Sequence, residues 1–184
     1  MALPRTVVRG GLVLAGAILV APLFSLPAAR AQGSCAGARV EPTGSNADQI
    51  APAILCLLNE ERSERGLKPL DDEDRLLKAA SRHSSDMVRR RYFDHRSPDG
   101  GTMVTRAKAA KYVPRDGSWK VAENLAWGTR SYGSARHVVA SWMRSAAHRR
   151  NILDDELRHA GVGAADGTPG GRRGATFTLL LGRR

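Results

Sequence analysis

The sequence is poor in cysteine and in aromatic residues. Its 184 residues include two cysteines and only 5% aromatic residues. Two cysteines are too few for a disulfide-scaffolded miniprotein or a zinc ribbon. Composition also excludes a collagen-like fibre, a disordered tail and a multi-span membrane protein. We find no internal repeat and no low-complexity tract. A single folded domain is the class that remains.

What the sequence does contain is basic charge and enough apolar residues for a core. It has 29 Lys and Arg against 18 Asp and Glu, a net charge of +11, and 42% hydrophobic residues. No nucleic-acid partner is expected, because the aromatic residues do not interleave with the arginine runs at 89–91 and 149–150. The charge indicates a solvated cationic surface, or attachment to an anionic cell wall or lipid surface.

Residues 1–31 have the pattern of a secretory signal peptide. Arg5 and Arg9 precede an apolar run at 12–26, and residues 29–31 (Ala-Arg-Ala) match the small-x-small pattern of a cleavage site. We predict cleavage after Ala31, a secreted protein and no stable transmembrane segment afterwards. The alternative is an uncleaved anchor, which would leave the protein associated with the cell envelope.

The two cysteines are expected to pair. Thiols of an exported protein usually oxidise, and Cys35 and Cys56 are the only two in the chain. The bond would close a loop of about 20 residues and stabilise the fold by about 3 kcal/mol. The alternative is two free thiols. Residues 32–47, rich in Gly, Ser and Pro, are predicted to form a flexible leader that carries Cys35 outside the core, before a domain at 48–184.

Periodicity predicts an α+β domain, with helices first and a small antiparallel sheet at the end. Residues 112–133 are expected to be mostly loop. The predicted helices cover 48–65, 71–91 and 102–111 and start again after Ser134, and the predicted strands cover 159–165 and 175–181.

Six short motifs follow one another in a fixed order. They are NEER at 59–62, AASRHSSDM at 79–87, YFDH at 92–95, ENLA at 123–126, WMRSAAHRRNIL at 142–153 and HAGVG at 159–163. In order and spacing the chain resembles the CAP superfamily, also called the SCP domain, which includes cysteine-rich secretory and plant pathogenesis-related proteins. It is most similar to the bacterial secreted branch. The resemblance covers residues 50–182 and implies an α-β-α sandwich around an antiparallel sheet.

The resemblance also implies a central cleft with two histidines and two acids. The histidines map to His95 and His159, and the first acid to Glu123. Ser145 stands at the position expected for the second acid. Two imidazoles and one carboxylate are the protein ligands of an open zinc site, so a divalent metal such as zinc is a possible cofactor. The alternative is that these side chains hydrogen-bond one another across a polar cleft.

We expect His95, Glu123 and His159 to converge. A buried carboxylate is costly without partners, so cationic or hydrogen-bonding groups should face Glu123. His83 lies on the apolar face of its helix and is interpreted as a core histidine. Its alternative is a general base beside Ser84 or Ser85, for which no orienting group is evident.

Three classes of function are compatible with these residues. A secreted, non-enzymatic module would bind a small ligand, lipid, wall polymer or partner protein in the His/Glu cleft. A metal-assisted hydrolase would use Glu123 with His95 and His159. A structural extracellular domain would keep a degenerate cleft. The sequence favours the binding module, because it lacks a nucleophile–base–orienter set and the second acid, and it leaves enzymatic activity open.

Overall fold

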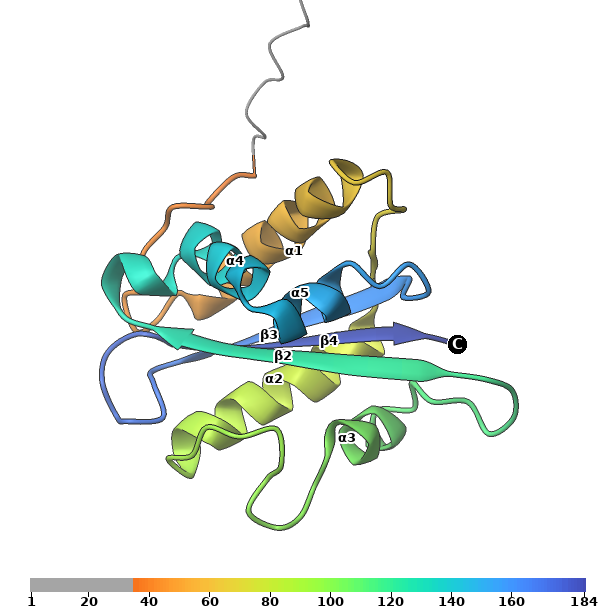
Figure 1. Ribbon diagram of the computed structural model, residues 1–184. Coiled ribbons are helices and arrows are strands. Elements are labelled where there is room, and N and C mark those ends of the chain that lie inside the picture. Colours follow the sequence, from red (N-terminus) through yellow and green to blue (C-terminus); the bar gives the residue numbers. More distant parts are fainter. Residues whose placement is uncertain (1–34) are drawn as a thin grey trace, which may run out of the picture. The chain divides into compact units, whose positions relative to one another are not determined.

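The computed structural model describes residues 35–184, so the predicted signal peptide and its cleavage site lie outside the described residues (Figure 1). The elements in chain order are α1 (Ala47–Ser63), β1 (Asp71–Asp72), α2 (Asp74–Arg89), α3 (Met103–Ala109), β2 (Lys120–Gly128), the 3-10 helix η1 (Arg130–Gly133), α4 (Ala135–Arg144), α5 (Ala146–Ile152), β3 (His159–Asp166) and β4 (Ala175–Arg183). Over the described residues, every helix is too short or too polar to cross a bilayer.

The sheet has four strands in the order β1-β3-β4-β2. β4 lies in the middle and pairs antiparallel with β2 on one side and β3 on the other, while the two-residue β1 pairs parallel to the start of β3. In this register Glu123 lies opposite Leu180, and His159 lies opposite Gly182. All of β4 except Arg183 is buried, as expected for a strand that is paired on both edges.

The structure corrects one prediction about secondary structure. Residues 112–133, expected to be mostly loop, contain β2, which pairs with β4 along its whole length. The polar neighbours Glu123 and Asn124 obscured the strand pattern, because both are buried. Successive side chains of a strand point to opposite faces. Each of these two polar side chains therefore meets partners from a different helical layer.

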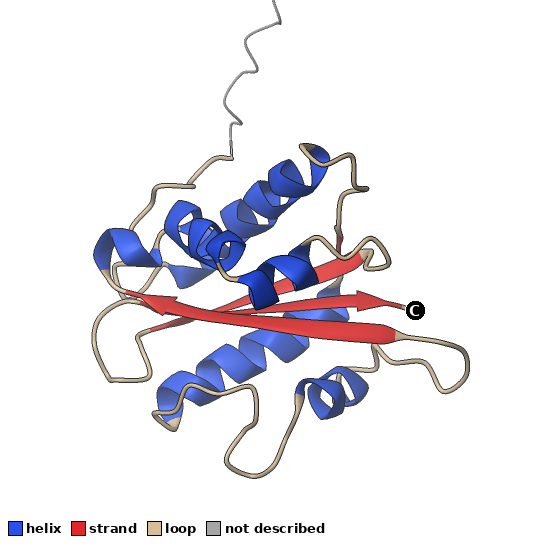
Figure 2. Ribbon diagram, in the orientation of Figure 1, coloured by secondary structure: helices blue, strands red, loops and turns tan. Residues whose placement is uncertain are grey.

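Helices cover both faces of the sheet, which confirms the predicted α-β-α sandwich. Figure 2 shows α1, α4 and α5 on one side and α2 and α3 on the other. The larger apolar cluster joins α1 and α4 to the sheet and includes Trp142 and Phe177. A smaller cluster joins α2 and α3 to it and includes Leu76, Tyr112 and Leu180. Burial of these side chains supplies the main driving force for folding.

A buried arginine ties the end of α1 to the segment that follows α5. Arg62 is fully buried, and its guanidinium donates hydrogen bonds to the carbonyl oxygens of Lys68, Ile152, Asp154 and Leu157 at 2.7–3.1 Å. Burial lowers the pKa of Arg62. Its donors satisfy carbonyls that would otherwise be left without partners at the end of α5.

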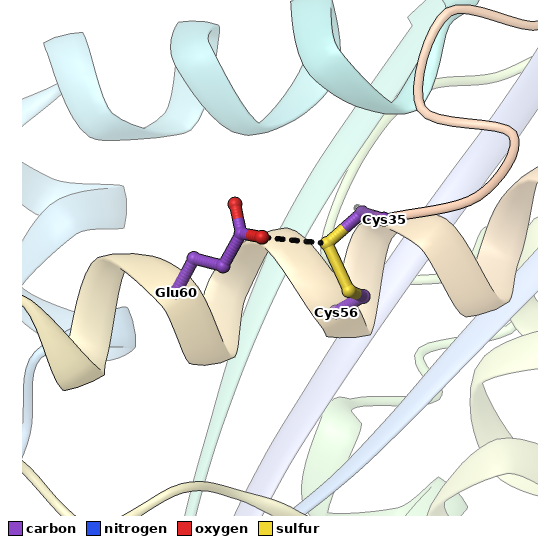
Figure 3. Close-up of side chains that lie close together, drawn as sticks. All are labelled: Cys35, Cys56 and Glu60. Atoms are coloured by element: carbon purple, nitrogen blue, oxygen red, sulfur yellow. Dashed lines mark hydrogen bonds between the residues drawn. A yellow bond between two sulfur atoms is a disulfide. The ribbon is translucent and has the colours of Figure 1, made fainter. Parts of the chain in front are cut away.

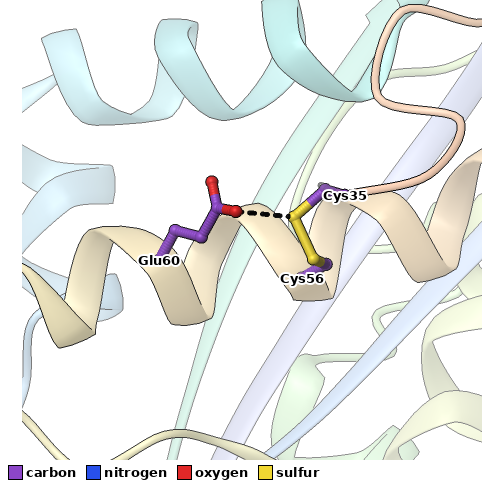
Figure 4. Close-up of a disulfide and its surroundings, with 3 residues drawn as sticks. All are labelled: Cys35, Cys56 and Glu60. Carbon is purple, nitrogen blue, oxygen red and sulfur yellow. Dashed lines mark hydrogen bonds between the residues drawn. A yellow bond between two sulfur atoms is a disulfide. The ribbon is translucent and has the colours of Figure 1, made fainter. Parts of the chain in front are cut away.

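The predicted disulfide is confirmed. Cys35 and Cys56 are bonded across 21 residues of sequence, and the bond joins the segment before α1 to the helix itself (Figure 4). Glu60, one helical turn after Cys56, places Oε1 3.2 Å from Cys35 Sγ (Figure 3). The oxidised sulfur carries no proton, so this contact becomes a hydrogen bond only when Cys35 is reduced to a thiol.

The segment before α1 packs more tightly than a leader outside the core would. Cys35 and Ala38 belong to the larger apolar cluster. The amide of Arg136 donates to the carbonyl of Ala38 at 2.9 Å, which attaches the segment to α4. Besides the disulfide, apolar burial and a backbone hydrogen bond therefore hold residues 35–46 on the domain.

Candidate functional site

Glu123, near the middle of β2, is the centre of a buried polar cluster. Its side chain has no solvent exposure. Arg106 Nη2 donates to Glu123 Oε1 at 3.0 Å and to Oε2 at 2.8 Å. His95 Nδ1 lies 2.9 Å from Oε1. Both carboxylate oxygens therefore have a charged or polar partner, which offsets the cost of burying the charge.

Arg106 also holds the loop that carries His95. It lies on α3, whose start is fixed by a capping box between Thr102 and Thr105. From there Nη2 donates to the carbonyl of His95 at 2.9 Å, and Nη1 donates to Ser97 Oγ at 3.3 Å. One guanidinium thus fixes both the buried carboxylate and the backbone of the residue whose imidazole meets it.

His83 extends the cluster beneath the surface. It is almost fully buried on α2, and its Nε2 lies 3.1 Å from the carbonyl of Asp94 and 3.9 Å from Glu123 Oε1. Its Nδ1 lies 3.4 Å from the hydroxyl of Tyr92, which donates to Asp86 Oδ2 at 2.7 Å. Burial lowers the pKa of His83, so the ring is neutral near pH 7. It is a buried histidine, as the sequence indicated, but it also borders the acid.

His95 is the exposed member of the cluster. Its side chain is 58% exposed, and the hydrogen bond with Glu123 raises its pKa. Since Nδ1 is engaged by the carboxylate, Nε2 is the nitrogen left for a ligand. His95 and Glu123 border a pocket of about 420 Å³ that also includes Arg96, Thr102 and Asn151. His95, Arg96 and Thr102 can therefore donate hydrogen bonds to a polar ligand, whereas the Asn151 amide group donates to Glu123 and Asn124.

Asn124 docks α5 against the other face of β2. Its Nδ2 donates to the carbonyl of His148 at 3.1 Å, and Asn151 Nδ2 donates to Asn124 Oδ1 at 2.9 Å. Asn151 also donates to the backbone carbonyl of Glu123 at 3.3 Å. In the Glu-Asn pair, the acid faces α3 while the amide positions the helix that borders the pocket.

The structure does not bring His159 to this cluster. Its Nδ1 lies 2.8 Å from the hydroxyl of Tyr112, and the two rings meet edge to face. Tyr112 fills the space over Gly182, where an added Cβ would lie 2.3 Å from the tyrosine oxygen. The expected convergence is therefore limited to His95 and Glu123, because Tyr112, in the segment that follows α3, engages the second histidine.

Ser145, at the position expected for a second acid, serves as a helix cap. It ends α4 and begins α5, and its Oγ accepts a hydrogen bond from the amide of His148 at 3.5 Å. A serine at an N-cap satisfies one of the free amides of the first turn. This residue therefore shapes the junction between the two helices.

A family model described as the cysteine-rich secretory protein family, CAP, matches residues 55–180. The chain belongs to this family. The Bacillus subtilis protein YkwD is 40% identical to this CAP domain over 111 residues, which cover 60% of this chain and 40% of YkwD. A second B. subtilis relative, the membrane protein YlbC, is 30% identical over 110 residues that cover 60% of this chain and 30% of YlbC. The matched stretch thus spans less than half the length of these curated relatives.

Solved structures show the same CAP fold. An extracellular protein containing an SCP domain from Bacillus anthracis superposes with a TM-score of 0.65 at 25% identity, over 77% of this chain and 43% of that chain. An outer surface protein of Borrelia burgdorferi superposes with a TM-score of 0.61 at 21% identity, over 78% of this chain and 97% of that chain. The second similarity concerns the fold alone.

The CAP site in this chain does not fit the zinc site considered from the sequence. Arg106 engages both oxygens of Glu123, and His159 is engaged by Tyr112. Within residues 35–184, one group of three ligand-type side chains lies within 4.8 Å, formed by Cys35, Cys56 and Glu60. Its two sulfurs are bonded to each other and are not thiolates. A guanidinium supplies the positive charge that a metal would bring to Glu123.

Arg106, His83 and Tyr92 complete the site, and sequence reasoning did not assign them to it. The cost of burying Glu123 predicted a cationic partner of some kind. Nothing in the sequence selected Arg106 among 29 basic residues. That choice depends on how α3 packs beside β2, and the spacing of the motifs does not encode it.

Proposed function

We propose that this CAP domain is an extracellular, non-enzymatic binding module whose polar ligand occupies the pocket beside His95. The observation that carries the proposal is the pairing of Arg106 with both oxygens of Glu123. A general base must have a free lone pair that faces its substrate. The Glu123 side chain has no solvent exposure and both of its oxygens accept from Arg106, which favours a role in orienting and charging His95 over a role as a base.

The exposed half of the site favours a ligand rich in hydrogen-bond acceptors. The His95 pKa is raised, so its ring is protonated more readily than a free histidine and then donates from Nε2. The donors Arg96 and Thr102 border the same pocket. Asp94, the acidic neighbour, accepts from the amide of Arg96 at 2.7 Å. Phosphate and carboxylate groups match this set of donors.

Three observations support an extracellular location. The sequence has the pattern of a secretory signal at 1–31, and the family that matches is named for secreted proteins. The disulfide agrees with an oxidising compartment. Detection of the protein in the medium or at the cell surface tests the location. An intact mass equal to that of a chain starting at Gln32 tests the cleavage.

The experiment for the site is a titration with phosphate, acetate and glycerol phosphate at about pH 6, followed by NMR and thermal unfolding. We expect binding to shift the His95 resonances and to raise the Tm of the unmodified protein and of His159→Ala, but not of His95→Ala. Equal stabilisation of both variants would contradict the proposal. Turnover of ester, amide or glycoside substrates that is lost in Glu123→Gln would favour the hydrolase instead.

A further inference from the structure

Three exposed aromatic side chains lie around one pocket near the end of β2. The sequence has three each of Trp, Tyr and Phe. Among residues 35–184, four large hydrophobic side chains are exposed, namely Val40, Phe93, Trp127 and Tyr132. The three aromatic ones border a single pocket of about 460 Å³, a volume typical of small-molecule sites. Exposure of large rings around one hollow indicates a binding surface.

Polar groups fix the orientation of two of these rings. The Arg172 guanidinium lies over the Trp127 indole, 5.5 Å from its centroid. The Tyr132 ring meets His137 edge to face, with 4.6 Å between centroids. His137 lies in the first turn of α4, where its amide donates to the capping Ser134. The rings are therefore held in place before any ligand arrives, which lowers the entropy cost of binding.

The backbone beneath the rings is also held tightly. A Cβ at Gly174 would lie 2.4 Å from the carbonyl oxygen of Gly128, and one at Gly128 would lie 2.3 Å from that of Tyr132. The end of β2, the 3-10 helix η1 and the loop before β4 therefore touch through backbone atoms. The amide of Arg172 donates to Thr168 Oγ1 at 3.0 Å, which fixes the loop further.

The pocket carries positive charge and no acidic lining residue. Arg172 is its permanent cation, and His137 and His148 are its two histidines. Burial lowers the pKa of His148, so that ring is neutral near pH 7. Ser141 and Thr129 add hydroxyl groups to the lining. An anionic ligand that also presents an apolar face and several hydroxyl groups complements this combination.

We propose that this aromatic pocket binds a carboxylated pyranose, the repeating chemistry of acidic cell-surface glycans. The C–H face of a sugar ring packs against aromatic faces such as Trp127 and Tyr132. Its hydroxyl groups hydrogen-bond to polar side chains such as Ser141, and its carboxylate pairs with the Arg172 guanidinium. This pocket and the His95 pocket share no lining residue, although His148 of this pocket lies close enough to His95 for the two rings to interact electrostatically. The proposal does not depend on the role proposed for His95.

Three soluble probes, titrated by calorimetry and tryptophan fluorescence against the full chain, test the proposal. A muramic-acid-containing oligosaccharide and a glucuronic-acid oligosaccharide represent the two sources of a carboxylated pyranose, and a neutral N-acetylglucosamine oligosaccharide controls for charge. We expect at least one acidic glycan to bind, with affinity reduced about tenfold or more in Trp127→Ala. Arg172→Gln should remove the preference for the acidic glycan over the neutral one.

A matched control variant makes the result specific. Arg136→Gln removes an exposed arginine of α4 outside the pocket. It should retain glycan binding, and each variant should unfold at a Tm close to that of the unmodified protein. Absence of binding to both acidic glycans overturns the proposal. Two other results would also overturn it. One is a glycan affinity in Trp127→Ala equal to that of the unmodified protein. The other is tighter binding of dodecanoate, an anion without a ring that represents a lipid ligand, than of either acidic glycan.

Discussion

His95 and His159 occupy contrasting environments, although the family pattern aligns both with one cleft. His95 meets a buried carboxylate that Arg106 also engages, so its partner is charged and its pKa rises. His159 meets the phenol of Tyr112, whose pKa burial raises to about 12, so its partner stays neutral. The chemistry of each histidine therefore depends on the side chain that it contacts, and the packing of the nearby helices determines which side chain that is.

The largest loss of stability is expected when the cation is removed from the charged site around His95. Arg106→Ala leaves the Glu123 carboxylate buried without its main partner and should lower the free energy of unfolding by about 3–5 kcal/mol. Urea denaturation measures the loss. Glu123→Gln replaces the carboxylate with a neutral amide of similar size and should lower the free energy of unfolding by less. A loss below 1 kcal/mol in Arg106→Ala would show that solvent already screens the pair.

Reduction of the disulfide should cost stability without altering either histidine. Cys35→Ser with Cys56→Ser removes a cross-link between residues 21 apart, which is expected to lower the free energy of unfolding by about 3 kcal/mol. The NMR resonances of His95 and His159 should keep their positions in the folded double variant. Movement of either resonance would mean that the cross-link shapes the site as well as the segment before α1.

The neutral site should respond more weakly. Tyr112→Phe removes the hydroxyl that bonds His159 and should cost about 1 kcal/mol in thermal or urea unfolding. The pKa of His95, followed by NMR, should not change. If Tyr112→Phe shifts the His95 titration by as much as Glu123→Gln does, the two histidines are coupled and the contrast between them fails.

The smallest effect concerns pH. The folded-state pKa of His95 lies above the value of about 6.5 expected in the unfolded chain. The stabilisation from its bond to Glu123 is therefore fully present below pH 6.5 or so and is lost as the pH rises through the folded pKa. The difference in stability between the unmodified protein and His95→Ala should be larger at about pH 5.5 than at about pH 8.5.

His83 contributes a pH dependence of the opposite sign. Burial lowers its pKa, so protonation opposes folding as the pH falls below the value of the unfolded chain. Both proteins in the previous comparison contain His83, and its contribution cancels in the difference. NMR titration of Glu123→Gln should return the His95 pKa toward 6.5; an unchanged value would show that Glu123 does not cause the shift.

The sequence predicted the architecture better than it predicted the site. Apolar periodicity located α1, α2 and both late strands, because those segments bury one face. It failed for β2, where Glu123 and Asn124 are buried through partners far away in sequence. The family motifs indicated the His95–Glu123 pair. They could not indicate Arg106, Tyr112 or the capping role of Ser145, since each depends on local packing.

The central position of β4 has a consequence for biogenesis. β2 and β3 form no ladder with each other, and each pairs with β4, the last strand along the chain. While β4 has not yet been synthesised, the two earlier strands therefore lack their shared neighbour. The sheet assembles only after the last strand has emerged, through contacts distant in sequence, which are slow to form. We expect the sheet to remain incomplete until β4 is available to pair with both of these strands.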